Sequence, residues 1–125
     1  MRIIKKITLS DIGSLKIQSE KEGLLFPKKE ILFIGMYEDE RLIAWGGINL
    51  KKRPIFKCDY VIPEYRRQGI GKQFITYRLK LLKELGYKTA EANATKLALN
   101  GHLRNGAKIN KKYKNGITQV IYENL

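Results

Sequence analysis

The sequence predicts a single α/β domain with a mixed, largely antiparallel sheet, and three observations indicate this fold class. First, 125 residues suit one compact domain, so we assign residues 1–125 to a single domain. Second, short β-rich runs and helical segments follow one another in the order β-α-β-β-β-α-β-α-β-β. Third, an Asn-Gly pair at 115–116 separates two β-patterned runs, which is typical of a hairpin.

The first half of the chain begins with a strand over 1–9 and continues with a helix over 10–25. Ser10 and Asp11 are good helix-capping residues, and Gly23 and Pro27 end the helical pattern. The acidic turn "EDE" joins two β-rich runs into a hairpin, and the breaker "KKRP" precedes a further run. These three strands are expected at 31–37, 41–50 and 55–62.

The second half continues with a helix over 71–86, which Gly86 ends. Its apolar residues recur at helical spacing and are expected to face the core: Phe74, Ile75, Leu79, Leu82 and Leu85. A short strand over 87–93 follows. A helix capped by Thr95 comes next, although Gly101 weakens its pattern. The chain closes with the Asn115–Gly116 hairpin.

The composition excludes several classes of protein. The N-terminus is basic but has no apolar run behind it, and no window approaches the roughly 20 apolar residues of a membrane span. This pattern predicts a cytoplasmic protein that does not insert into a membrane. Cys58 and His102 are each the single residue of their type, so an internal disulfide and a structural zinc site are excluded and no metal is expected. The apolar neighbours of Cys58 favour packing over a nucleophilic Cys–His pair.

The net charge is high. Lys and Arg number 25 against 12 acidic residues, which gives a formal charge of +13 spread along the chain. One interpretation is a lysine-rich surface with no specific role. The other is an acidic partner, which could be nucleic acid, a phosphorylated cofactor or an acidic protein.

The stretch "VIPEYRRQGIGKQF", residues 61–74, links the third of these strands to the second long helix. Gly69 and Gly71 allow a tight bend and the close approach of a ligand. The first amides of the helix have no intrahelical acceptors, and they form an anion site to which Arg66, Arg67 and Lys72 add positive charge. The spacing does not match a Walker A loop or a Rossmann fingerprint. We therefore predict a pyrophosphate site of another kind.

This loop resembles the acyl-CoA loop of the GNAT family of CoA-dependent N-acyltransferases, with Arg66, Gly69 and Gly71 at the motif positions. The element order also resembles the GNAT order over nearly the whole chain. The resemblance implies a sheet splayed at its centre, between the strand ending at Ile62 and the strand around Glu91, with acetyl-CoA as co-substrate. It implies cofactor contacts from the following residues: Val61, Ile62, Arg66, Arg67, Gln68, Gly69, Ile70, Gly71 and Lys72.

The chain departs from the GNAT pattern on its last helix. The family often has a tyrosine there that protonates the departing thiolate, and here His102 stands at that place. An imidazolium could serve as the acid, or His102 could be a solvated surface residue. Tyr113 and Tyr122 are weaker substitutes. Asn93 and Thr95 are the nearest matches to an asparagine that commonly begins that helix segment and are included among the cofactor contacts.

Asp59 and Glu91 lie near the places where the family's general bases often occur, and each can equally be an ordinary sheet carboxylate. The resemblance implies transfer of an acetyl group to an amine. Three classes remain: an acetyltransferase acting on a small or protein amine, an acyltransferase acting on nucleic acid such as tRNA or a DNA base, and a non-catalytic GNAT-like binding module. The protein is expected to be a monomer or a homodimer.

Overall fold

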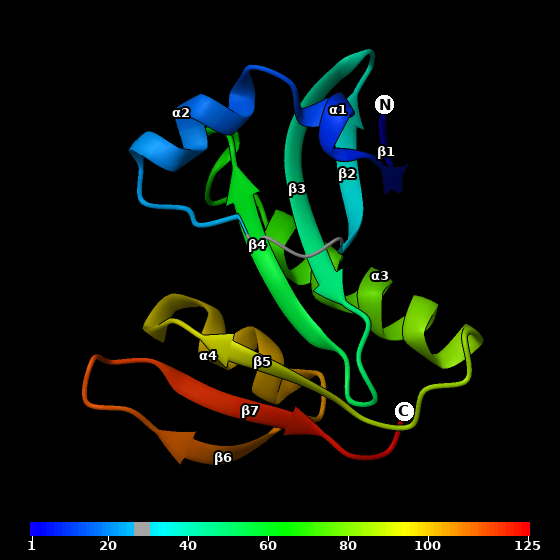
Figure 1. The fold of residues 1–125 in the computed structure, drawn as a ribbon, viewed down its shortest axis with the longest axis vertical. Helices are drawn as coiled ribbons and strands as arrows, with labels where there is room; N and C mark the ends of the chain where they lie inside the picture. Colours follow the sequence, from blue (N-terminus) through cyan, green and yellow to red (C-terminus); the bar gives the residue numbers. More distant parts are fainter. Residues whose placement is uncertain (27–30) are drawn as a thin grey trace.

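The computed structural model describes residues 1–26 and 31–125, so Pro27, one of the expected helix breakers, lies outside the described residues. Within them, seven strands form one sheet in the order β1-β2-β3-β4-β5-β7-β6 (Figure 1). The strands are β1 (Arg2–Ile7), β2 (Leu32–Glu38), β3 (Arg41–Asn49), β4 (Ile55–Val61), β5 (Ala90–Ala94), β6 (Lys108–Lys112) and β7 (Thr118–Tyr122). The helices are α1 (Leu9–Ile12), α2 (Leu15–Lys21), α3 (Ile70–Glu84), α4 (Lys96–Arg104) and the short 3-10 helix η1 (Pro63–Tyr65). The predicted fold class is confirmed.

The sheet is splayed at its centre, as predicted. In the described chain every neighbouring pair of strands is antiparallel except β4 and β5, which run parallel. These two strands share only two register positions, Ile55 with Glu91 and Phe56 with Ala92. Beyond Phe56 the strands diverge, so β4 and β5 form the two arms of a V (Figure 1).

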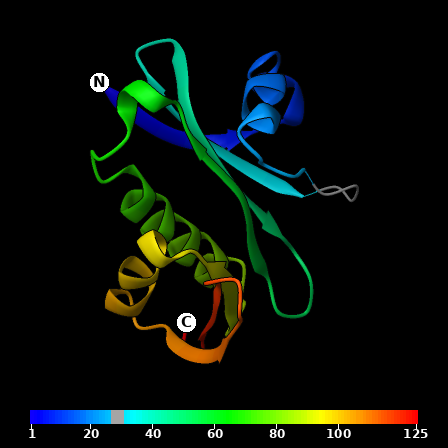
Figure 2. The same ribbon diagram turned by 90° about the vertical axis from the view of Figure 1, so that its left-hand side faces the viewer.

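Helices cover both faces of the sheet. Figure 2 shows α3 and α4 on one side and the short helices α1 and α2 on the other. The apolar residues accordingly form two clusters. The larger cluster packs α3 against the sheet through residues such as Phe74 and Leu82, and the smaller cluster lies around Trp45 and Ile12.

Three sequence predictions are corrected by the structure. The helix expected over 10–25 is two short helices, because Gly13 adopts a φ of 56° that ends the first of them. The cap of α1 is Thr8, whose side chain forms a capping box with Asp11, rather than Ser10. On α3, Leu85 is 49% exposed rather than part of the core.

The helix α4 forms in spite of Gly101. The Thr95 hydroxyl accepts a hydrogen bond from the Ala98 amide at 3.3 Å and so caps the helix as predicted. The Asn115–Gly116 hairpin is also present, and it places β6 at the edge of the sheet. No helix within residues 1–26 and 31–125 is long and apolar enough to cross a membrane.

Candidate functional site

The loop before α3 folds around two residues with left-handed backbones, Arg67 with a φ of 64° and Gly69 with a φ of 79°. Gly69 is the N-cap of α3, and the first hydrogen bond of the helix joins the Gln73 amide to the Gly69 carbonyl. The three amides of residues 70–72 therefore have no intrahelical acceptor and point out of the helix start. A Cβ atom built on Gly71 would meet no atom of the described residues outside its own helix within 4 Å, so there is open space beside this glycine.

A cavity of about 540 Å³ lies between this loop, the open side of β4 and the helix α4. It brings together ten of the residues predicted for the site from sequence. These are Asp59, Val61, Arg66, Arg67, Gly69, Ile70, Gly71, Lys72, Thr95 and His102. Tyr65, Asn100 and Arg104 also line the cavity, and the sequence analysis did not identify them.

Four predicted site residues are not among those that line this cavity. Ile62 is buried in the smaller apolar cluster, and the Gln68 side chain accepts a hydrogen bond from Arg2. Asn93 lies on β5 with its side chain exposed. Glu91 pairs with Ile55 at the closed end of the V, 3.8 Å from the Arg53 guanidinium, so its predicted role as a base near the reacting atoms has no geometric support.

A β-bulge in β4 decides which side chains of this strand face the cavity. The register shifts between Trp45 and Gly47 of β3, so that Cys58 and Asp59 together lie opposite Gly46, and Cys58 adopts a φ of 58°. An extra residue reverses the alternation of faces along a strand. Before the bulge the even-numbered Phe56 packs in the larger cluster, beneath α3, whereas after it Tyr60 packs in the smaller one.

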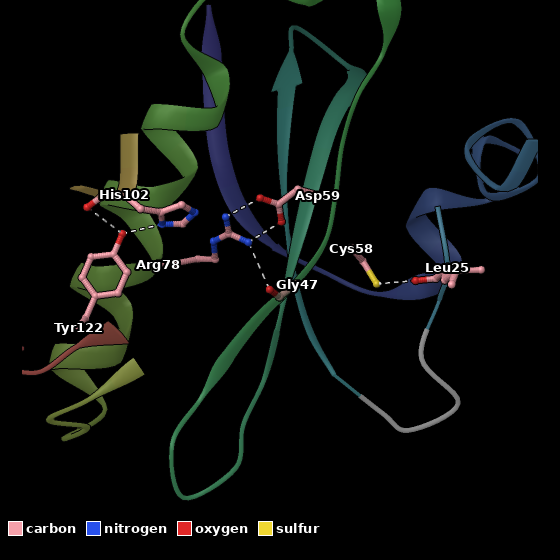
Figure 3. Close-up of polar contacts among 7 residues, drawn as sticks. All are labelled: Leu25, Gly47, Cys58, Asp59, Arg78, His102 and Tyr122. Atoms are coloured by element: carbon pink, nitrogen blue, oxygen red, sulfur yellow. Dashed lines mark hydrogen bonds and ion pairs between the residues drawn. The ribbon is translucent and has the colours of Figure 1, made fainter. Parts of the chain in front are cut away.

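Asp59 consequently points toward α3, where it meets Arg78. The two guanidinium nitrogens Nη1 and Nη2 of Arg78 donate to the Asp59 carboxylate at 2.6 and 2.7 Å, and Nη1 also donates to the Gly47 carbonyl (Figure 3). The Arg78 side chain is completely buried, whereas that of Asp59 is half exposed in the cavity. A Cβ on Gly46 would lie 2.9 Å from both partners, so only glycine leaves room for this pair.

Arg78 is a residue that sequence reasoning missed. Its guanidinium carbon lies 4.3 Å from the centre of the Phe56 ring, so the cation stacks on an aromatic face. The signal was present in the sequence, because position 78 is one helical turn from Phe74 and one from Leu82 on the buried face of α3. A charged residue at a core position of a helix needs a partner of opposite charge, and Asp59 is that partner.

His102 lies on α4 and is 5% exposed, which corrects the alternative that it is a solvated surface residue. Its Nδ1 atom is 2.6 Å from the hydroxyl of Tyr122 on β7, and in Figure 3 its ring lies between Tyr122 and the Asp59–Arg78 pair. Burial, followed by the nearby positive charge of Arg78, lowers the pKa of His102 to about 4. The ring is therefore neutral at pH 7, and the imidazolium expected from sequence is not its resting form.

The backbone of β4 presents a hydrogen-bond donor to the open side of the V. The Ile62 amide donates to the Ile43 carbonyl of β3 at 2.9 Å. Hydrogen-bonded and non-hydrogen-bonded pairs alternate along an antiparallel ladder, so the next pair, Ala44 with Val61, is not hydrogen-bonded. The Val61 N–H and C=O therefore face away from β3, toward β5. The carbonyl accepts from Nε of Arg66 at 2.9 Å, and the N–H is the group directed into the splay.

The Arg66 side chain is held by contacts with the loop and with neighbouring residues and does not extend freely into the cavity. Besides its bond to Val61, its Nη2 atom donates to Glu22 at 2.8 Å, and its guanidinium carbon lies 5.4 Å from the centre of the Tyr60 ring. The Tyr60 hydroxyl donates to the other oxygen of Glu22. These hydrogen bonds from Tyr60 and Arg66 lower the pKa of Glu22. The network connects the region just after α2 to the loop that begins α3.

Cys58 points to the opposite face of β4 from Asp59 (Figure 3). Its Sγ atom donates to the Leu25 carbonyl at 3.2 Å, and burial together with the charge of Asp59 raises the pKa of the thiol to about 11. The thiol therefore has little thiolate character near neutral pH and does not pair with His102. Within residues 1–26 and 31–125, no three His, Cys, Asp or Glu side chains gather as metal ligands would.

The chain is similar in fold to several solved structures. No curated protein sequence matches it. Among solved structures, the PaiA N-acetyltransferase of Thermoplasma acidophilum in complex with coenzyme A has a TM-score of 0.73 at 16% identity, covering 100% of this chain and 99% of its own. The ribosomal-protein-S18-alanine N-acetyltransferase of Escherichia coli has a TM-score of 0.71 at 14% identity, over 97% of this chain and 91% of its own.

A third structure, an N-acetyltransferase from Staphylococcus aureus Mu50, has a TM-score of 0.72 at 15% identity and covers 98% of this chain and 97% of its own. At these identities the likeness establishes the fold. The sequence profile of the acetyltransferase (GNAT) family matches residues 9–103, which include α3, the loop before it and most of α4. The chain therefore belongs to the acetyltransferase (GNAT) family.

Proposed function

We propose that this protein transfers an acetyl group from acetyl-CoA to an amine. The observation that carries the proposal is that one cavity extends from the start of α3, where the amides have no intrahelical acceptor, to the edge of β4 that has separated from β5. A helix start with free amides, together with the backbone donor at Val61, suits a long thioester with a phosphorylated end. Family membership supports the same co-substrate.

The residues around the cavity divide the binding of acetyl-CoA between them. The amides of residues 70–72, with Arg67 and Lys72, would hold the pyrophosphate, since a helix start with nearby cations favours an anion. The pantetheine arm would lie in the splay along Val61. The Val61 N–H would donate to the thioester carbonyl oxygen, on which negative charge develops as the amine attacks.

The two polar side chains on facing walls of the cavity complete the proposed chemistry. The acceptor nitrogen, in its neutral form, forms a bond to the acetyl carbon, and the carbon–sulfur bond breaks with its electron pair on sulfur. Asp59 has both oxygens bound to Arg78, yet these oxygens retain lone pairs that can accept an acceptor N–H. His102 would donate a hydrogen bond to the leaving sulfur.

Calorimetric titration with acetyl-CoA tests the binding part of the proposal. Arg67→Glu and Gly71→Leu are each expected to weaken binding at least tenfold, since a lost charge-assisted contact costs about 1.5–3 kcal/mol. Lys83→Glu, which makes the same charge change in the last turn of α3, is the matched control and is expected to bind as the wild type does. Equal affinity in all four proteins would refute the assignment of the loop.

Mass spectrometry of candidate amines incubated with acetyl-CoA tests the transfer itself. A mass increase of one acetyl group, lost in the Asp59→Asn and His102→Gln variants, is the expected result. Tight acetyl-CoA binding without transfer to any amine would instead favour the non-catalytic GNAT-like binding module.

An acidic acceptor, nucleic acid in particular, is the second candidate, because the charge is unevenly divided. Residues 66–125 carry 13 Lys and Arg against 3 acidic residues, whereas residues 1–65 carry 12 against 9. For a nucleic-acid acceptor, binding of a fluorescent single-stranded oligonucleotide should weaken at least tenfold between 50 and 200 mM salt, as phosphate contacts dictate. Absence of binding at 50 mM salt would exclude this candidate.

A further inference from the structure

Among the described residues, only one of the two ring nitrogens of His102, Nδ1, has a hydrogen-bond partner. Tyr122 is 2% exposed, and its hydroxyl lies 2.6 Å from Nδ1 of His102 and 3.5 Å from the His102 carbonyl oxygen. The other ring nitrogen, Nε2, is directed away from Tyr122 toward the Asp59–Arg78 pair, in the part of the cavity that Asp59 and His102 share (Figure 3).

We infer that Tyr122 is a positioning residue of the active site: its hydroxyl donates to Nδ1 of His102, which places the ring's own proton on Nε2, the nitrogen turned toward the cavity. The tautomer follows from the geometry alone. The role of the Nε2–H group of His102 in catalysis rests on the proposed function.

The alternative arrangement leaves a buried proton poorly bonded. If Nδ1 carried the proton and donated to Tyr122, the acceptor left for the hydroxyl proton among residues 1–26 and 31–125 would be the His102 carbonyl at 3.5 Å, which is at the limit of a hydrogen bond. A buried hydroxyl without a proper acceptor costs about 1–3 kcal/mol. With Tyr122 as donor, the bond is short and direct, and the remaining N–H faces the cavity.

The charged groups around the ring keep it neutral, and the hydrogen bond with Tyr122 then selects the tautomer. Three groups face it from three elements: Tyr122 from β7, Arg78 from α3 and Asp59 from β4. Burial and Arg78 oppose a second proton on the ring and outweigh the Asp59 carboxylate, which favours one. The ring is thus held neutral, with a fixed donor rather than a transferable proton.

A fixed donor has a defined part in the reaction. When the carbon–sulfur bond breaks, the electron pair and the negative charge go to sulfur, and the Nε2–H group of His102 can donate to that sulfur. The proton that the sulfur finally takes is the one that the acceptor nitrogen loses. Tyr122 never touches the reacting atoms and acts through His102.

Nitrogen NMR of the uniformly ¹⁵N-labelled protein tests the tautomer without any substrate. His102 is the only histidine, so its two ring nitrogens are assigned without ambiguity. The expected spectrum shows an unprotonated Nδ1 and a protonated Nε2 from pH 6 to 8. A protonated Nδ1, or a doubly protonated ring at pH 7, would overturn the inference. This measurement of the tautomer uses only the wild-type protein, so it does not depend on whether a variant folds.

The variant Tyr122→Phe tests whether the Tyr122 hydroxyl sets the tautomer of His102. It is expected to give a mixture of tautomers, while Tyr113→Phe, which removes the hydroxyl of a 40% exposed tyrosine, keeps the wild-type spectrum. An unchanged tautomer in a folded Tyr122→Phe protein would show that Tyr122 does not set it.

The pKa of enzyme-bound CoA, read from the ultraviolet absorbance of its thiolate, tests the use of the donor. In the wild type and in Tyr113→Phe it is expected to fall at least one unit below the value of about 8.5 for a free thiol. In Tyr122→Phe it should return to within half a unit of that value, with CoA affinity changed less than threefold. Equal values in the wild type and Tyr122→Phe would overturn the positioning role. Absence of CoA binding would refute the proposed function and leave the tautomer to be judged by NMR.

Discussion

A completely buried arginine destabilises a protein unless a group of opposite charge pairs with it, and Asp59 pairs with Arg78. Both hydrogen bonds of the pair are short, and Gly46 is the residue whose missing side chain makes room for them. The same carboxylate reaches the cavity with its exposed half. Asp59 is therefore a structural partner and a candidate contact for the acceptor, and a substitution affects both properties.

The Asp59→Asn variant is predicted to lower the free energy of unfolding by about 3 kcal/mol, because it leaves the buried Arg78 cation without a counter-charge. Urea denaturation at pH 7 measures the effect. Glu64→Gln is the control, since Glu64 pairs with Arg41 on the surface and should contribute less than about 1 kcal/mol. If the two variants are equally stable, the Asp59–Arg78 ion pair does not contribute to the stability of the fold.

His102 predicts a dependence of stability on pH. The pKa of His102 in the folded protein, about 4, lies below the usual value near 6.5. Between pH 4 and pH 6.5, His102 is therefore mostly protonated in the unfolded chain and mostly neutral in the folded protein. The free energy of unfolding should therefore fall as the pH drops through this window, by about 2 kcal/mol between pH 6.5 and 5. In His102→Gln this part of the slope should disappear. An identical slope in both proteins would mean that another group is responsible.

At the scale of elements, α4 brings Thr95 and His102 to the same cavity. Thr95 is also the N-cap of α4, so substitutions can separate its capping role from a contact with the ligand. Thr95→Ala is predicted to cost about 1 kcal/mol of stability, whereas Thr95→Ser should cost little because the hydroxyl is retained. Thermal or urea unfolding measures both. If acetyl-CoA affinity drops in Thr95→Ala but not in Thr95→Ser, the hydroxyl also contacts the ligand; a stable Thr95→Ala protein would contradict the capping role.

Local patterns in the sequence predicted most of these elements. The spacing of Phe74 and Leu82 defined α3, and Gly69 and Gly71 identified the loop before it, because helix periodicity and left-handed turns depend on neighbouring residues. The pairing of Asp59 with Arg78 could not be predicted in this way, since it depends on an extra residue in β4. The position of Glu91 outside the cavity could not be predicted for a related reason: the family resemblance implied the splay but did not say at which end it closes.

At the scale of the whole molecule, the two arms of the V meet along β4 and β5 at only two register positions, and α3 packs against β3 and β4 in one arm and α4 in the other. A ligand in the splay would contact both arms. Acetyl-CoA at 100 times its dissociation constant is predicted to stabilise the protein by about 2.7 kcal/mol. Hydrogen exchange should slow most at β5 and at the amides of residues 70–72, with β1 as the internal control. Uniform slowing over all strands would argue against binding in the splay.

The bulge at Cys58 and Asp59 has a consequence for how this protein tolerates change. The bulge places Asp59 three residues after Phe56 and yet on the same face of β4, because Cys58 is an extra residue opposite Gly46. Deletion of Cys58 would restore a regular strand in which Asp59 lies two residues after Phe56 and still points toward α3, whereas deletion of Tyr60 would keep the bulge and turn Val61 to the opposite face. Libraries of single-codon deletions should therefore find position 58 more permissive than the positions that follow it in β4.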